Sequence, residues 1–111
     1  MESILTSVKK MLGIEEDDIG FDEEIIMHIN SVLMALTQIG VGPAEGFEIE
    51  DSTTEWRDFL PDMKKFSAVK SYLFMRVKLL FDSSTMSSSL IEAYNRQIAE
   101  FEWRLNHAAE S

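Results

Sequence analysis

The stretch FSAVKSYLFMRVKLLF, residues 66–81, decides the fold of this chain. On a helical wheel its apolar residues cover nearly the whole circumference, and the only continuous polar stripe consists of Ser67, Ser71 and Lys78. A helix that is apolar nearly all round is a buried helix. The run is too short to cross a bilayer, and it does not alternate polar with apolar residues as a half-buried strand does. We therefore predict a central helix at residues 65–81.

Apolar residues at helical spacing predict further helices around this one. The mostly α fold expected is a small bundle of four to five helices in a single domain, residues 1–111, with one long acidic loop at residues 40–63. The other helices are expected at about residues 3–12, 22–39, 54–60 and 88–108. The core residues expected are Ile25, Ile29, Leu36, Val69, Leu73, Val77, Leu80, Ile98, Phe101 and Leu105.

The whole-chain composition limits the classes of function. The chain has 111 residues, a hydrophobic fraction of 45%, no cysteine and a net charge of −10. The absence of cysteine excludes disulfides, thiolate metal sites and cysteine nucleophiles, and no secretory signal is expected at the start. The acidic charge disfavours ordinary binding to nucleic-acid phosphates. One explanation of the negative charge is solubility. The other is a surface that stays near DNA without binding it, or a surface that imitates DNA.

The acidic run at residues 15–24 invites a comparison with calcium sites. An EF-hand loop with Gly20 at its sixth position would need an acid or amide at residue 19 and a glutamate at residue 26, where the chain has Ile19 and Ile26. We expect no metal site, because acids at the start of the next helix are favoured by the helix dipole. No phosphate-binding glycine loop, metalloprotease motif or nucleophile elbow is present, so no enzyme activity and no cofactor are expected.

Two surfaces are candidates for contacts with a partner. Met27 and Met34 lie seven residues apart on the otherwise polar side of the second helix, and they are either single exposed methionines or an adaptable contact. Trp103 lies on the polar side of the last helix with Glu92, Arg96 and Glu100, which are spaced for i,i+4 ion pairs. Trp103 is either an interface anchor or is covered by the long loop folding back.

The order of these features resembles a known family. The run DEEIIMHINSVLMALTQIGVGP, residues 22–43, is followed by Trp56, Asp58, Phe59 and Leu60, then VKSYLFMRVKLLFD, residues 69–82, and IEAYNRQIAEFEWRLN, residues 91–106. This order is similar to that of the small head–tail connector, or adaptor, proteins of tailed double-stranded-DNA bacteriophages. Ser83 and Ser84 stand where similar proteins are expected to have prolines, so the shape of that turn is expected to differ.

The resemblance implies a structural virion protein. Its protomers form a homo-oligomeric ring beneath the portal protein, and the ring extends the DNA channel towards a stopper or tail-completion protein. Genomic DNA then passes nearby without specific binding, and no cofactor, reaction or membrane is involved. The protein is expected at the head–tail junction, after assembly in the host cytoplasm. The acids expected to border the channel are Glu15, Glu16, Asp17, Asp18, Glu48, Glu50 and Asp51.

The alternative is an acidic regulatory or DNA-mimic protein that occupies the DNA-binding site of a host or phage protein. It explains the net charge as directly as the connector does. It requires no ring, and it does not explain a tryptophan on the polar face of a helix.

Overall fold

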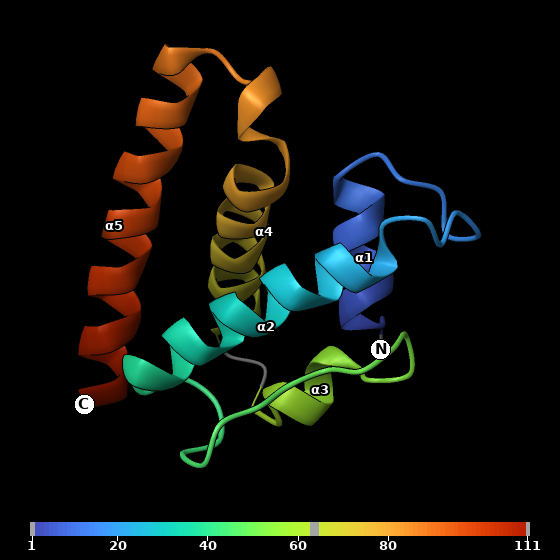
Figure 1. The fold of residues 1–111 in the computed structure, drawn as a ribbon. Coiled ribbons are helices and arrows are strands. Elements are labelled where there is room, and N and C mark those ends of the chain that lie inside the picture. The colour runs from blue at the N-terminus through green and yellow to red at the C-terminus, as the bar shows by residue number, and fades with distance from the viewer. Residues whose placement is uncertain (1, 63–64, 111) are drawn as a thin grey trace.

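The fold is an arrangement of helices around one central helix. A computed structural model describes residues 2–62 and 65–110 (Figure 1). In chain order the elements are α1 (Ile4–Met11), α2 (Asp22–Gln38), α3 (Trp56–Phe59), α4 (Phe66–Asp82), the short 3-10 turn η2 (Ser83–Thr85) and α5 (Ser88–Glu110). These bounds lie within about two residues of the expected ranges, and no β-strand forms among the described residues. The fold is therefore mostly α, as predicted.

Local signals in the sequence set several helix ends. The Ser3 side chain accepts a hydrogen bond from the Thr6 amide at 3.1 Å and caps α1. Three acids occupy the first turn of α2, where the helix dipole favours negative charge. Gly42 follows α2 with φ of 85°, and a Cβ atom there would overlap the Phe59 ring. Only glycine therefore suits this position, where the chain turns back under α2.

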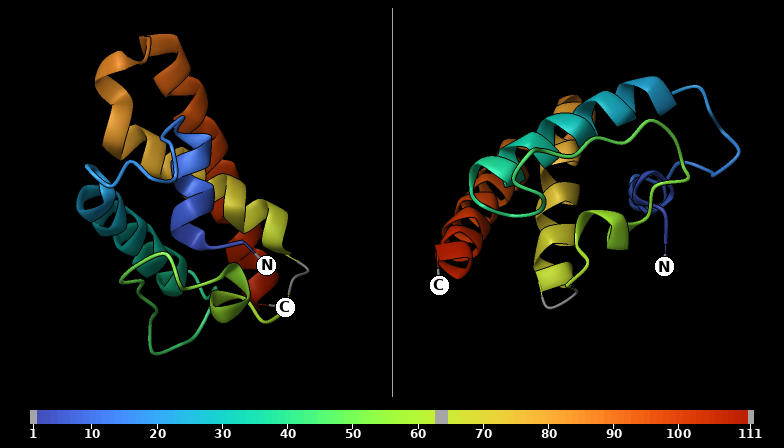
Figure 2. Two further views of the ribbon diagram at one scale, coloured as in Figure 1. Left: turned by 90° about the vertical axis from the view of Figure 1, so that its right-hand side faces the viewer. Right: turned by 90° about the horizontal axis from the view of Figure 1, so that it is seen from below.

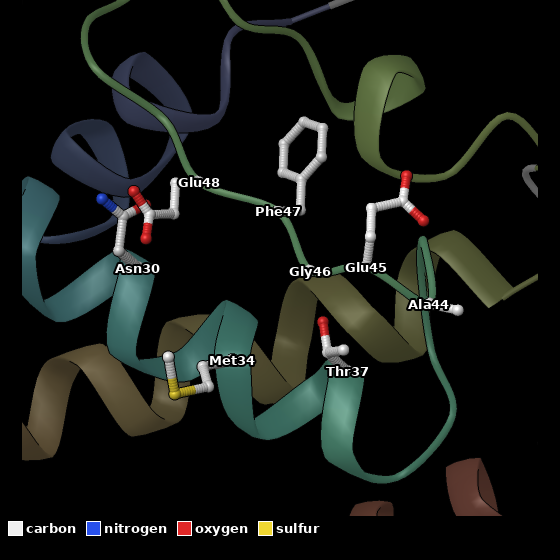
Figure 3. A pocket seen from close by; sticks show the side chains of 8 residues that line it. All are labelled: Asn30, Met34, Thr37, Ala44, Glu45, Gly46, Phe47 and Glu48. Carbon is white, nitrogen blue, oxygen red and sulfur yellow. The ribbon is translucent and has the colours of Figure 1, made fainter.

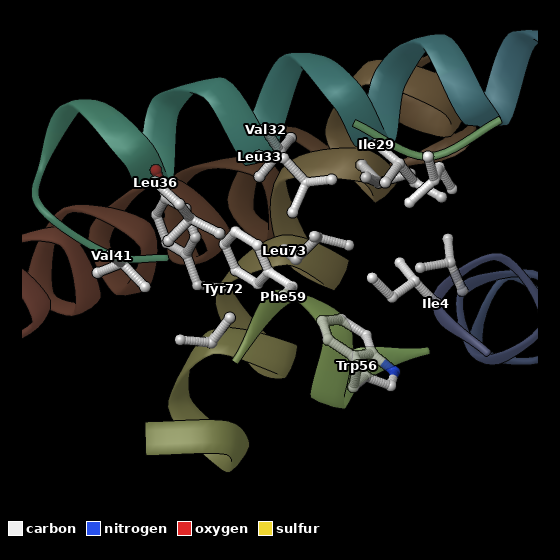
Figure 4. Packing of buried hydrophobic residues seen from close by; sticks show 14 of the residues in the cluster. Ile4, Ile29, Val32, Leu33, Leu36, Val41, Trp56, Phe59, Tyr72 and Leu73 are labelled. Carbon is white, nitrogen blue, oxygen red and sulfur yellow. The ribbon is translucent and has the colours of Figure 1, made fainter. Parts of the chain in front are cut away.

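The central helix, α4, lies between α2 and α5. α2 crosses one side of α4, α5 packs along another side, and α1 packs against α2 (Figures 1 and 2). The buried side chains form one cluster between these helices, part of which is shown in Figure 4. Eight of the predicted core residues are buried in it: Ile25, Ile29, Leu36, Val69, Leu73, Val77, Ile98 and Leu105. Phe101 is partly buried and packs against this cluster.

The prediction for Leu80 was wrong. Its side chain is 48% exposed, although its helical position matches that of the buried Val69 and Leu73. Leu80 lies in the last turns of α4, and these turns extend past the crossing with α2 (Figure 1). Helical periodicity identifies which face of a helix is apolar, but it does not show how far along that face the neighbouring helix reaches.

The long loop between α2 and α3 is packed onto the bundle. The Asn30 side chain donates to the Ile49 carbonyl at 3.0 Å and accepts from the Ile49 amide at 2.8 Å. Ile49 is buried, and Phe47 stacks on Phe59 with 5.2 Å between ring centroids. Because one asparagine satisfies both backbone groups of Ile49, this segment is held on α2 without a β-sheet.

Trp56 connects this loop to the N-terminal helix. It is fully buried, and its indole Nε1–H donates to the Ser7 hydroxyl at 2.9 Å. The Ile4 amide also donates to the Thr54 carbonyl at 3.0 Å, which joins the start of α1 to the segment before α3. α1, α3 and the long loop are therefore one packed unit around Trp56.

The two tryptophans allow a matched test of this packing. We expect Trp56→Ala to lower the free energy of unfolding by about 3–5 kcal/mol, because it removes a large buried side chain and the hydrogen bond to Ser7. Trp103→Ala, which removes an exposed tryptophan, should change it by less than about 0.5 kcal/mol. Urea denaturation of both variants measures the difference. Equal losses would contradict the packing described here.

Candidate interaction surfaces

The first acidic stretch is a loop held in place by a buried lysine. Lys9 is 2% exposed, and its ammonium group lies 2.8 Å from the Asp22 carboxylate and donates to the Glu16 carbonyl at 2.9 Å. The four acids Glu15, Glu16, Asp17 and Asp18 are exposed on this loop. Their charge is therefore presented to solvent from an anchored backbone. The sequence analysis did not single out Lys9, because nothing in its local pattern distinguishes it from the exposed Lys10.

The second acidic stretch lies in the long loop. Glu48, Glu50 and Asp51 are exposed, while Ile49 between them is buried. Asp51 accepts hydrogen bonds from the hydroxyl and the amide of Thr53, and these bonds hold the pKa of its carboxyl below the ordinary value. The first acidic stretch lies at the edge of the molecule beside α1, and α5 forms the opposite edge, while the long loop that carries the second stretch runs beneath α2 towards α1 (Figures 1 and 2).

The two methionines of α2 face solvent. Met27 is 62% exposed and Met34 is 59% exposed. Met34 also borders a hollow of about 410 Å³ between α2 and the long loop (Figure 3). We call this hollow the Met34 groove; the residues that line it are Asn30, Met34, Thr37, Ala44, Glu45, Gly46, Phe47 and Glu48.

Trp103 is exposed on α5. Its side chain is 64% exposed, and its ring lies 4.1 Å from the ring of His107, one turn further along the helix. The long loop packs on α2 and α3 instead of on α5. Of the two alternatives left open by the sequence, the structure therefore excludes coverage by the loop.

The ion pairs expected beside Trp103 are not those that form. Glu100 pairs with Arg104, one turn towards the C-terminus. Arg96 pairs with neither Glu92 nor Glu100, although the spacing allows both, and all three residues are exposed. Glu100 has i,i+4 partners on both sides, and a sequence pattern cannot choose between them.

A polar network fixes α5 against α4 next to Trp103. The Tyr72 hydroxyl donates to the Glu102 carboxylate at 2.7 Å, and Arg76 donates to the same hydroxyl at 2.8 Å. Burial raises the pKa of Tyr72 to about 12, and the bond to Glu102 adds to this effect. The network therefore sets the position of the helix that carries the exposed tryptophan. The pairing was not predicted from the sequence, because the two residues lie on different helices.

The described surface offers no cluster of metal ligands and no membrane-spanning helix. In the described residues, no three His, Asp or Glu side chains are arranged to hold a metal ion. No helix within residues 2–62 or 65–110 has the length and apolarity needed to cross a membrane. The features that stand out on the surface are thus acids and exposed apolar side chains.

A comparison with known protein families assigns the chain to one of them. The family model described as "Phage connector protein" matches residues 4–111. The chain belongs to this family. No curated protein and no solved structure matches the chain.

Family membership supports a phage head–tail connector with a structural role, as the resemblance implied. Phage connectors are structural proteins and not enzymes. They belong at the head–tail junction of the virion, in association with portal and tail proteins.

The tyrosine network predicts a pH dependence. The folded pKa of Tyr72, about 12, lies above the unfolded value of 10.0, so the folded state keeps its proton longer. The stabilisation is fully present below pH 10 and is lost as the pH rises from about 10 to 12. Tyr72→Phe should weaken this alkaline loss of stability. Tyr94→Phe, at the other tyrosine, is the control, and an unchanged profile in Tyr72→Phe would contradict the assignment.

Proposed function

We propose that this connector forms a homo-oligomeric ring between the portal and a stopper or tail-completion protein, and that the ring extends the DNA channel. The family match over residues 4–111 is the observation that carries the proposal. A virion component at the head–tail junction has to contact one assembly on the head side and another on the tail side. A ring of identical protomers does this with a single chain and closes on itself.

The exposed apolar side chains support self-assembly. Met27, Met34 and Trp103 lie on the solvent faces of two different helices, and their fractional exposures are 59–64%. Head-to-tail contacts require two different surfaces on each protomer, and these helices supply them. Aromatic residues and methionine are enriched in the cores of protein interfaces, so contact with a neighbour would remove these side chains from water.

The acidic edge supports a passage for DNA. The loop of residues 15–18, whose four acids are exposed, lies at the edge opposite α5, and Glu48, Glu50 and Asp51 are exposed on the long loop, which runs beneath α2 towards that edge. We infer that this edge borders the channel, where negative charge would repel phosphate groups and let the genome pass without binding. The repulsion acts within about 8 Å at physiological ionic strength, so it operates only on DNA close to the wall.

The alternative, an acidic regulatory or DNA-mimic protein, has less support. The net charge of −10 is compatible with both proposals, but the family match favours a head–tail connector. A DNA mimic also needs no exposed tryptophan on a face away from its acids. The two proposals differ in stoichiometry and in the salt dependence of partner binding.

Light scattering tests the assembly directly. We expect the protein, alone at high concentration or mixed with its portal, to form one closed species with a fixed number of protomers, as a symmetric ring requires. The contact between neighbouring protomers should survive moderate salt, because part of this contact is apolar. Trp103→Ala should shift the protein towards monomers without unfolding it, as circular dichroism would verify. A protein that remains monomeric or dimeric, even with the portal, would contradict the ring.

Charge reversal tests the channel edge. Replacing Glu15, Glu16, Asp17 and Asp18 with lysine should make the assembled ring retain double-stranded DNA at low salt, because the wall would then attract phosphate. Retention is measured by gel shift, and it should disappear at high salt. The wild-type ring, assembled in parallel, is the control. If the reversed ring retains no DNA at low salt, these four residues do not border the channel.

A further inference from the structure

The Met34 groove is an apolar hollow that no side chain of the described chain fills. α2 contributes Asn30, Met34 and Thr37 on one side, and the loop at residues 44–48 forms the other side (Figure 3). Phe47 is partly buried and stacks on Phe59, and Asn30 ties the loop to α2 through Ile49. The groove is therefore pre-formed, with an apolar surface between anchored walls. Its volume of about 410 Å³ falls within the range of about 300–1,000 Å³ typical of ligand sites.

Trp103 is the side chain in this protein most suited to such a groove. It is the largest of the exposed apolar side chains, and its helix is fixed to α4 by the Tyr72–Glu102 hydrogen bond. A rigidly presented tryptophan loses little conformational entropy on binding and carries a large apolar area. Met34 would meet its ring, and contacts between methionine sulfur and aromatic rings are favourable.

One charge beside Trp103, that of Arg96, is complementary to the charges beside the groove. Glu45 and Glu48 are exposed at the groove, and no ion pair or hydrogen bond engages either side chain within the described chain. Arg96 is exposed without such a partner, and it shares the solvent face of Trp103 at a distance of about 10 Å along the helix axis. Glu100, which lies between them, is already paired with Arg104. An arginine beside the tryptophan thus matches free carboxylates beside the groove, and such pairs set the register of a contact.

These observations assign the occupant to a second copy of the same chain. Trp103 does not line its own groove, because it projects from the solvent face of α5 while the groove lies between α2 and the long loop. We propose that Trp103 of one protomer sits in the Met34 groove of the next, with Arg96 directed at Glu45 and Glu48. Each protomer then uses one tryptophan and one groove, which is a head-to-tail contact. This inference rests on the proposed function and specifies the contact that builds the ring.

Cross-linking between cysteines tests the pairing, because the native chain contains none. Ala44 is at the groove, and Ala99 lies one turn before Trp103; both are exposed. With a short bis-maleimide, a mixture of the Ala44→Cys and Ala99→Cys proteins should give a heterodimer. The double variant should give a ladder of covalent multimers. Efficient homodimers of Ala99→Cys alone would overturn the proposal, because they indicate a symmetric contact between two α5 helices.

A control position and a charge exchange make the test specific. Gln97 is exposed on α5 but lines a different hollow with Phe101 and Arg104, so Gln97→Cys should cross-link poorly to Ala44→Cys. In the double variant, Arg96→Glu should reduce the ladder about five- to tenfold, the size expected of a charge-assisted contact. Adding Glu45→Arg and Glu48→Arg should restore it. Equal yields at residues 97 and 99, or no rescue, would overturn the pairing.

Light scattering of the wild-type protein with and without its portal separates the two proposals. If the ring forms but no specific ladder appears, the groove assignment is wrong and the ring stands. If no oligomer forms in either condition, the proposed ring fails, and the groove assignment fails with it. A ring together with a specific ladder supports both.

Discussion

Burial of α4 between α2 and α5 is the constraint on which the rest of this connector depends. The helix is apolar around most of its circumference, so it cannot remain at a surface without exposing a large apolar area to water. α2 covers one side with Ile25, Ile29 and Leu36, and α5 covers another with Ile98 and Leu105. Each covering helix is left with a solvent face, and the candidate contact residues lie on these two faces.

Polar groups inside this packing position the surfaces. Asn30 holds the long loop on α2, Trp56 joins that loop to α1 through Ser7, and Lys9 anchors the first acidic loop. The Tyr72–Glu102 bond fixes the helix that carries Trp103. The proposed ring would benefit from such anchoring, because a contact repeated around a closed ring requires the same geometry in every protomer.

The distribution of charge and apolar surface suits a component of the head–tail junction. The acidic loop of residues 15–18 lies beside α1, and the exposed tryptophan is on α5, on the other side of α4 (Figure 1). A contact through Trp103 therefore leaves this acidic loop in solvent. The acids that the proposed contact covers, Glu45 and Glu48, would face Arg96, because burying an unpaired carboxylate costs several kcal/mol.

The sequence by itself determined the helices, most of the core and the polar helix faces on which Met27, Met34 and Trp103 lie, because helical periodicity records which face of each helix meets water. It also carried the family resemblance, because the order of helices and aromatic residues is a property of the chain. Only the tertiary structure decided the exposure of Leu80, the choice of Arg104 as the partner of Glu100, the anchoring by Lys9 and the existence of the Met34 groove. These depend on how far one helix extends across another and on contacts between distant residues, and a pattern within a single helix contains neither.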